Sequence, residues 1–178
     1  MVSLVDLGRD LAGVAGLAVL AMIAGVAINR FSERPLTMAY QSPEQRLQSE
    51  LSELVAAPPL ASFPVDTIDL DHFRSAVDQR SMIVLDARSS FYYGQGHVPG
   101  ALNLSRDHFA ADYTRLRSTL DQAKDRAIIV YCSGGACHDS KMVAQALTSL
   151  GFNNVRIFAD GWDAWARAGL PADRGTHP

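Results

Sequence analysis

The sequence predicts an α/β domain built on a mostly parallel sheet with helices on both faces. The main evidence is a set of short apolar runs, 82–85, 128–131 and 154–158, whose β-branched residues are typical of buried strands. Segments with helical spacing of apolar residues separate these runs, and such alternation favours parallel pairing of the strands. The chain has 178 residues, 48% hydrophobic and 20% charged, which suits one globular domain with an additional segment.

The additional segment lies at the amino end, in residues 1–29. From Leu11 to Ile28, eighteen consecutive residues carry no charged or strongly polar side chain. A helix of that length is about 27 Å long, close to the roughly 30 Å of a bilayer's hydrocarbon core, so we expect one transmembrane helix at 11–28. A cleaved signal peptide and a buried core helix are the alternatives. The first rests on the small residues at 25–27, but the start of the chain lacks a clear basic character.

The charges that flank this segment predict its orientation. Arg30 and Arg34 follow the apolar run, whereas only Arg9 precedes it. By the positive-inside rule, we expect a single-pass membrane protein whose carboxyl-terminal domain lies on the cytoplasmic side.

Residues 30–65 are expected to connect this anchor to the domain. Ser42, Pro43 and Gln45 have the order of a helix start, with a capping serine, a proline at the first helical position and a capping-box glutamine. Apolar residues then recur at helical spacing, which predicts an amphipathic helix over 43–56. Its apolar side is expected either on a membrane surface or docked on the domain, and we favour docking. A Pro-rich linker follows at 57–64.

The domain itself is expected over residues 66–174, with a short tail at 175–178. A strand at 67–68 precedes a helix that Asp69 caps. The later elements are predicted in the following order: a strand at 82–85, a short helix or turn at 89–94, a strand at 101–103, a helix through Tyr113, Leu116 and Leu120, a strand at 128–131, a helix through Val143, Ala146, Leu147 and Leu150, and a strand at 154–158.

One loop is the best candidate for chemistry, and it lies between the 128–131 strand and the following helix. It reads Cys132-Ser133-Gly134-Gly135-Ala136-Cys137-His138. The carboxyl ends of strands are where open α/β sheets place ligands. Adjacent glycines allow the loop amides to fold toward the sulfur, and the helix terminus adds partial positive charge. We therefore expect a stabilised thiolate at Cys132, although a buried, inert cysteine is the alternative.

Several further motifs, taken in order along the chain, resemble the rhodanese family. They cover about residues 66–174 and are Asp86-Ala87-Arg88 after a strand, Gly96-His97-Val98-Pro99-Gly100-Ala101-Leu102-Asn103, Val130-Tyr131-Cys132 with its glycine loop, Leu150-Gly151-Phe152-Asn153-Asn154-Val155, Gly161-Trp162-Asp163-Ala164-Trp165 and Gly169-Leu170-Pro171. The resemblance implies a five-stranded parallel sheet between helices. It also implies a cysteine that carries sulfane sulfur as a persulfide, and sulfur transfer from a donor such as thiosulfate to a thiophilic acceptor.

The resemblance also assigns roles to individual residues. Cys132 matches the sulfur-carrying cysteine, and the loop that would cradle it consists of Ser133, Gly134, Gly135, Ala136 and Cys137. Asp86, Arg88 and His97 match positions that we expect to be mainly structural. Many members of the family have an arginine where this chain has Cys137, so a guanidinium suited to an anionic donor is missing here.

Cys137 itself suggests a second chemical step. If it reaches Cys132, it can attack the inner sulfur of the persulfide, expel sulfide and close a disulfide. This would make the protein a thiol-linked sulfur reductase or a redox-coupled sulfur relay. The alternative is that Cys137 only packs at the helix start. His138 either supplies a cation or a proton near the sulfur or faces solvent, and we favour solvent.

These observations predict a membrane-anchored sulfurtransferase, a transferase that acts through Cys132 without a cofactor. Its expected partners are a small sulfur donor and a thiol acceptor. The alternative is a non-enzymatic, membrane-tethered docking or redox-sensing module. A phosphatase is disfavoured because His138 stands where an arginine would close the anion cradle. A metal site at Cys132, Cys137 and His138 lacks a clear fourth ligand. The net charge of -3 gives no reason to expect nucleic acid.

Overall fold

The computed structural model describes residues 4–31, 40–54, 66–122, 124–135 and 137–175. The chain forms two compact units, Met1–Tyr40 and Gln41–Pro178, which are described separately. The expected linker at 57–64, and the ends of the predicted 30–65 connector, lie largely outside the described residues.

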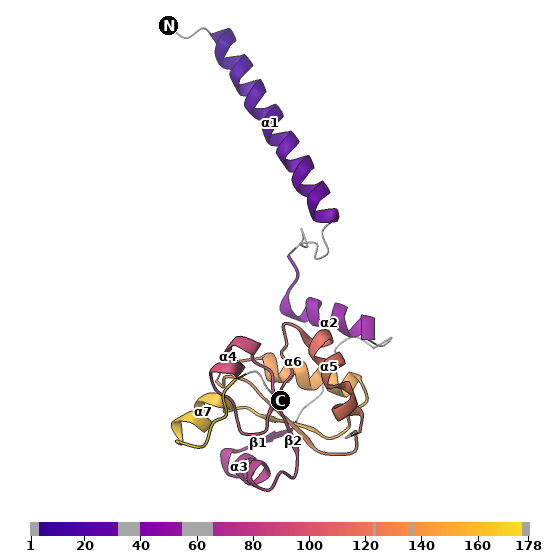
Figure 1. Cartoon of the computed structure of the whole chain (residues 1–178), viewed down its shortest axis with the longest axis vertical. Helices are drawn as coiled ribbons and strands as arrows, with labels where there is room; N and C mark the ends of the chain where they lie inside the picture. The colour runs from indigo at the N-terminus through magenta and orange to yellow at the C-terminus, as the bar shows by residue number, and fades with distance from the viewer. Residues whose placement is uncertain (1–3, 32–39, 55–65, 123, 136, 176–178) are drawn as a thin grey trace. The chain divides into compact units, whose positions relative to one another are not determined.

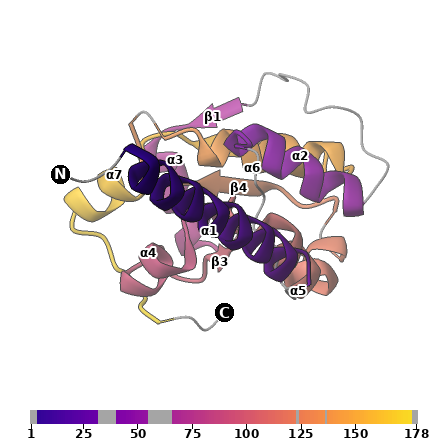
Figure 2. The ribbon, with the colours of Figure 1, turned by 90° about the horizontal axis from the view of Figure 1, so that it is seen from above.

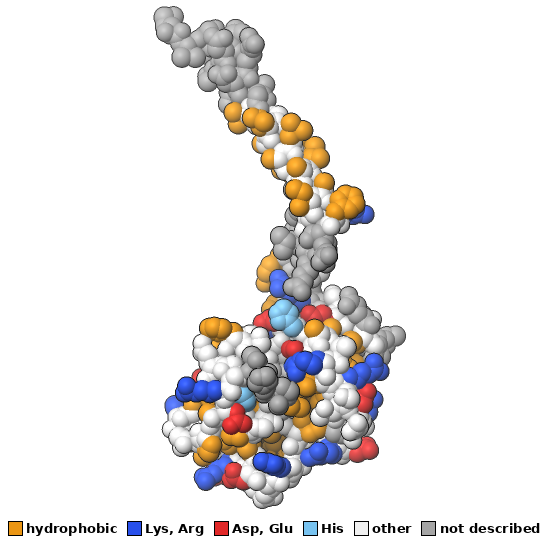
Figure 3. Space-filling model, viewed as in Figure 1, with side chains coloured by type: hydrophobic (Ala, Val, Ile, Leu, Met, Phe, Trp, Pro, Cys, Tyr) orange, Lys and Arg blue, Asp and Glu red, His pale blue; other side chains and the backbone are white. Residues whose placement is uncertain are grey.

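Within its described residues, the first unit contains one helix, α1, Leu4–Arg30. Its large apolar side chains from Val14 to Ile28 are exposed (Figure 3). The sequence predicted a membrane span at 11–28, but within the described residues no helix combines the length and the apolar character needed to cross a bilayer. The predicted anchor, and the membrane side that was inferred from it, therefore find no support in the structure.

The second unit is built on a five-stranded sheet in the order β1-β5-β4-β2-β3, in which every neighbouring pair is parallel. This confirms the predicted sheet, and each strand lies within one or two residues of its expected place. The strands are β1 Asp66–Ile68, β2 Ile83–Asp86, β3 Leu102–Asn103, β4 Ile128–Tyr131 and β5 Val155–Phe158.

Helices cover both faces of this sheet (Figures 1 and 2). The helices that follow the first strand are α3 Leu70–Asp78, α4 Ser90–Gln95, α5 Phe109–Asp121, α6 Asp139–Ser149 and α7 Gly161–Arg167. Successive residues of β4 alternate between two apolar clusters: Ile128 and Val130 pack with α5 and α6, whereas Ile129 and Tyr131 pack with α3 and α7. Burial on both faces explains why the strands are continuous apolar runs.

Helix α2, Pro43–Leu54, docks on the domain, as the favoured alternative expected. The predicted capping box is present, because the Ser42 amide donates to Gln45 Oε1 at 2.9 Å and the Gln45 amide donates to Ser42 Oγ at 3.3 Å. Leu47 and Leu51 are 0% exposed and join the apolar cluster of α5 and α6. The carboxylate of Glu50 also accepts a hydrogen bond from the amide of Ala110, at the start of α5.

The strand register positions the candidate site. Asp86, Tyr131 and Phe158 are paired across β2, β4 and β5. The residues that follow these three strands therefore lie at one edge of the sheet, and Cys132 is the first residue after the central strand, β4. This is the edge at which parallel sheets present functional groups.

The docking of α2 predicts a measurable share of the domain's stability. Leu51→Ala removes a fully buried side chain and should lower the free energy of unfolding by about 2–5 kcal/mol. Ser52→Ala, at the exposed neighbouring position, should change it by no more than about 0.5 kcal/mol. Urea denaturation of both variants measures the difference, and equal midpoints would contradict the packing of α2 on the domain.

Candidate active site

The first turn of α7 holds the Cys132 loop in place. The carbonyl oxygen of Cys132 accepts a hydrogen bond from the Trp162 amide at 2.8 Å, and that of Ser133 accepts one from the Asp163 amide at 2.9 Å. Main-chain bonds thus join the loop to a helix that is distant in sequence. The position of Cys132 is consequently set by the backbone of another segment as well as by β4.

Two glycines permit this close approach. Gly134 has a φ of 118° and Gly161 a φ of 60°, which are backbone conformations that other residues rarely adopt. A Cβ atom at Gly134 would collide with the carbonyl oxygen of Asp160, and one at Gly161 would collide with that of Cys132. The Gly134 position in the motif therefore has a local steric reason, and so has Gly161, which the sequence analysis did not single out as a site residue.

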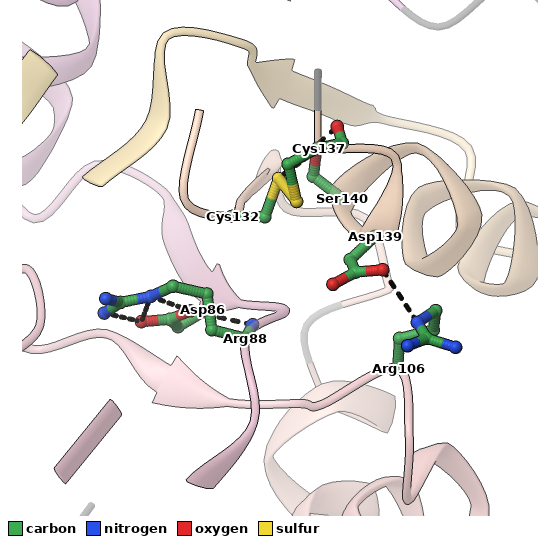
Figure 4. The surroundings of a disulfide bond; sticks show 7 residues. All are labelled: Asp86, Arg88, Arg106, Cys132, Cys137, Asp139 and Ser140. Atoms are coloured by element: carbon green, nitrogen blue, oxygen red, sulfur yellow. Dashed lines mark hydrogen bonds and ion pairs between the residues drawn. A yellow bond between two sulfur atoms is a disulfide. The ribbon is translucent and has the colours of Figure 1, made fainter. Parts of the chain in front are cut away.

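Cys132 and Cys137 are joined by a disulfide (Figure 4). Their Cα atoms are 6.5 Å apart, within the range that a disulfide spans. Cys132 is 1% exposed, whereas Cys137 is only partly buried. The two sulfurs thus differ in access from solvent, and the inner one belongs to the cysteine that the sequence analysis chose as the nucleophile.

The sulfur of Cys132 has two further polar neighbours among the described residues. It lies 3.4 Å from the hydroxyl oxygen of Ser140 and 3.6 Å from the carbonyl oxygen of Cys137. Ser140 is 3% exposed and lies in the first turn of α6. The sequence analysis missed this residue, although a serine at the second position of a helix that follows a cysteine loop was a visible signal.

The sequence predicted that loop amides point toward the Cys132 sulfur, but the Cys137 amide does not. That N–H donates instead to the carbonyl oxygen of Gly134, at 3.2 Å. Because a disulfide sulfur carries no negative charge, the oxidised pair places no demand on anion-stabilising donors. The amide cradle stays a prediction for the reduced protein.

A cation lies beside the start of α6, although the loop itself contains none. Arg106, from the segment after β3, pairs with Asp139 at 2.7 Å and with Asp107 at 2.7 Å. Figure 4 shows the Asp139 carboxylate turned from the first turn of α6 toward this guanidinium. The positive charge of Arg106 also acts on Glu44, in α2. Hydrogen bonds from Ser42 and from its own amide are the main causes that lower the pKa of Glu44, and the charges of Arg106 and His138 lower it further by a smaller amount. Sequence reasoning missed Arg106, since no local motif marks it.

Asp86 and Arg88 form a buried ion pair that lies apart from the two sulfurs (Figure 4). The Arg88 guanidinium donates to both carboxylate oxygens of Asp86, at 2.6–3.1 Å, and to the carbonyl oxygen of Gly96 at 2.7 Å. The ring of Trp162 lies 4.8 Å from the guanidinium carbon. Burial alone would lower the pKa of Arg88, but the hydrogen bonds and charge of Asp86 raise it, so the guanidinium stays charged.

Tyr131 completes this cluster. Its hydroxyl donates to Asp86 at 2.7 Å and accepts a hydrogen bond from the Val98 amide at 3.1 Å. Burial, together with the charge of Asp86, raises the pKa of Tyr131 well above its ordinary value. The cluster therefore ties the ends of β2 and β4 to the loop at 96–98 with satisfied polar groups.

His97 and His138 occupy different surroundings. His97 is 3% exposed, its Nδ1 lies 2.9 Å from the Tyr93 carbonyl oxygen, and its ring stacks on Tyr93. Its main chain pairs with Asp173 in both directions. His138 is exposed at the start of α6, where its side chain makes no capping bond.

Two further residues of the loop, Ser133 and Gly135, are exposed, and Ala136 lies outside the described residues. Within the described parts of the chain, no group of three or more His, Cys, Asp or Glu side chains is arranged to hold a metal ion.

Known proteins that resemble this chain include a regulator, a sulfurtransferase and a protein of solved structure. The HTH-type transcriptional regulator Rv0324 of Mycobacterium tuberculosis is 29% identical over 122 residues, which are 68% of this chain and 51% of that protein. The thiosulfate sulfurtransferase GlpE of Haemophilus influenzae is 33% identical over 95 residues, 53% of this chain and 83% of that one. The crystal structure of the Alr3790 protein from Anabaena sp. has 27% identity and a TM-score of 0.51, and covers 60% of this chain and 81% of that chain.

The chain therefore spans about half the length of the regulator and most of the sulfurtransferase. The family model for the Rhodanese-like domain matches residues 69–168. This range is more than half of the chain and contains the whole Cys132 loop, strands β2 to β5 and helices α3 to α7. The chain belongs to the rhodanese-like domain family.

Proposed function

We propose that this protein is a sulfurtransferase that carries sulfane sulfur as a persulfide on Cys132. The observation that carries the proposal is the place of Cys132, directly after the central strand and beside the first turn of α6. Membership of the rhodanese-like family and the resemblance to a protein named thiosulfate sulfurtransferase support it. The proposed partners are a small sulfur donor and a thiol acceptor.

The loading step requires the reduced protein. The Cys132 thiolate attacks the outer sulfur of thiosulfate, the sulfur–sulfur bond of the donor breaks, and sulfite leaves with the electron pair. The negative charge then resides on the outer sulfur of the persulfide. Oriented dipoles at the start of α6, the loop amides and the Ser140 hydroxyl are the groups available to stabilise it.

The second step uses Cys137. Its thiol attacks the inner sulfur of the persulfide, hydrosulfide leaves with the thiol proton, and the Cys132–Cys137 disulfide forms. Such a step would yield a Cys132–Cys137 disulfide, and the presence of this bond in the structure supports the proposal that Cys137 is the resolving residue. The proposed product is sulfide.

Other site residues have supporting roles in this proposal. Ser133, Gly134, Gly135 and Ala136 form the loop that would surround the outer sulfur. Asp86, Arg88 and His97 hold the neighbouring loops, because their polar atoms are used in buried contacts away from the sulfurs. His138 is exposed and can meet an incoming donor or acceptor at the surface.

A redox-sensing module is the second candidate, and the disulfide is the observation that favours it. In this alternative, oxidation of the cysteine pair changes the surface of the loop and thereby the binding of a partner, without sulfur transfer. A persulfide on Cys132 with turnover distinguishes the enzyme from the sensor.

Mass spectrometry of the reduced protein after treatment with thiosulfate tests the proposal. With the wild type, thiosulfate should be converted to sulfite and sulfide should be released, while the protein gains an intramolecular disulfide. Cys137→Ser should retain one added sulfur on Cys132 and release little sulfide. Cys132→Ser should neither gain a sulfur atom nor release sulfide, because it lacks the nucleophile.

An equal rate of sulfide release by the wild type and Cys137→Ser would remove the resolving role of Cys137. Absence of any added sulfur in Cys137→Ser, with both thiosulfate and a small persulfide as donors, would remove the sulfurtransferase and leave the sensor.

The Ser140 contact predicts a shift in the pKa of the Cys132 thiol. A hydrogen bond to a charged group contributes about 1.5–3 kcal/mol, so Ser140→Ala should raise this pKa by about 1–2 units. The thiolate's ultraviolet absorbance, followed against pH in the Cys137→Ser background, measures the shift. Ser133→Ala, at an exposed position of the same loop, is the matched control. An unchanged pKa in Ser140→Ala would exclude a role for this hydroxyl.

The Asp86–Arg88–Tyr131 cluster should matter for stability more than for chemistry. Tyr131→Phe keeps the ring but leaves Asp86 and the Val98 amide each without one hydrogen bond, at a cost of about 1–3 kcal/mol. Urea denaturation should detect this loss, whereas exposed Tyr92→Phe should be neutral. Sulfur loading of folded Tyr131→Phe should match the wild type, and a loss of loading without a loss of stability would assign the cluster a chemical role.

A further inference from the structure

We propose that the oxidised protein is reset by a dithiol reductant that attacks the sulfur of Cys137 and never that of Cys132. The inference rests on the proposed function, since it describes how the same cysteine pair returns to the state that accepts sulfur. It assigns the two sulfurs distinct roles, Cys137 as the electrophile and Cys132 as the leaving group.

Access is the first reason. A thiolate displaces a disulfide sulfur in line with the bond that breaks, so it must approach from the side opposite the departing sulfur. For Cys132 that side is the interior, because this residue is 1% exposed and belongs to the apolar cluster of β4, α5 and α6. Cys137 is partly exposed and lies at the rim of that cluster, between exposed Gly135 and His138. An incoming thiol therefore meets Cys137.

The leaving group is the second reason. Attack at Cys137 releases Cys132 as a thiolate, and a better stabilised thiolate leaves faster. The Ser140 hydroxyl lies 3.4 Å from the Cys132 sulfur, in the first turn of an 11-residue helix whose amino end carries partial positive charge. Attack at Cys132 would instead release Cys137, whose sulfur has no such hydroxyl contact among the described residues.

These steps balance as two successive displacements. The reductant's first thiolate forms a bond with the Cys137 sulfur as the Cys132–Cys137 bond breaks, and Cys132 takes the electron pair. The reductant's second thiolate then attacks its own first sulfur, and Cys137 leaves as a thiolate that takes up a proton. The protein gains two electrons, and the reductant ends as an internal disulfide.

The chemical class of the partner follows from the same geometry. After the first displacement, the Cys132 thiolate stays beside the mixed disulfide and can attack Cys137 again, which expels the incoming thiol. A monothiol is therefore returned, whereas a dithiol removes itself through its second thiol. The partner that fits is a molecule or protein with two neighbouring thiols, at least one of them exposed.

A trapping experiment tests the regiochemistry without any sulfur donor. The oxidised full-length chain is mixed with glutathione and quenched within seconds with excess N-ethylmaleimide, and fragment-ion mass spectra locate both groups. We expect glutathione on Cys137 and maleimide on Cys132. The reverse placement, an equal mixture, or the lack of a Cys132–Cys137 disulfide in the oxidised chain would overturn the proposal.

A kinetic arm tests the leaving-group argument. With dithiothreitol in excess, Ser140→Ala should open its disulfide about threefold more slowly than the wild type, given a one-unit rise in thiol pKa and a sensitivity of about 0.4–0.5. Ser149→Ala, at the other end of the same helix, should open at the wild-type rate. An unchanged rate in Ser140→Ala would overturn the leaving-group assignment. A chain that traps glutathione on Cys137 but never binds sulfur refutes the proposed function alone, and a chain that binds sulfur but traps glutathione on Cys132 refutes this inference alone.

Discussion

The parallel register of β2, β4 and β5 is the constraint on which the site depends. It places the ends of three strands at one edge, so that Cys132 leaves the central strand between the loops that follow its two neighbours. Main-chain bonds from Trp162 and Asp163 to Cys132 and Ser133 then fix the base of the loop. A slip of one residue in β4 would exchange its two buried faces and turn the site inward.

Two groups of polar residues at this edge have different roles, one in holding the loops and one beside the Cys132 sulfur. The Asp86–Arg88–Tyr131 cluster is charged, buried and fully engaged, and it stabilises the arrangement of loops without contacting the sulfurs. Among the described residues, the donors available to Cys132 are the Ser140 hydroxyl and the main-chain amides of the loop and of the amino end of α6, none of which is charged. Arg106, the cation beside α6, is already paired with Asp139 and Asp107. Stabilisation of an anion at Cys132 must therefore come mainly from dipoles.

The cysteine pair is asymmetric because the fold buries one partner and leaves the other near the surface. Cys132 follows a strand that is buried on both faces, whereas Cys137 comes five residues later at the start of a helix. In the proposed chemistry this difference in burial sets a direction for reduction of the disulfide: an incoming thiol meets the Cys137 sulfur, and Cys132 departs as the thiolate. A symmetric, exposed pair would have no such preference.

Local patterns in the sequence determined the elements of this domain and the place of its candidate nucleophile. Apolar runs predicted the strands, the Ser42 to Gln45 capping box predicted the start of α2, and the position of Cys132 between a strand and a helix predicted the candidate site. Each of these features depends on residues within a few positions of one another. The number of strands in the sheet followed from the family resemblance, and the order β1-β5-β4-β2-β3 came from the structure alone.

Only the tertiary structure decided which distant groups meet. It brought Ser140 to the Cys132 sulfur, Arg106 to Asp139 and the apolar side of α2 to α5 and α6, and it gave no support to the predicted membrane span. The physical reason is that such contacts depend on packing and strand order across the whole domain. A local pattern shows that a side chain is apolar or charged, but the fold determines what it touches.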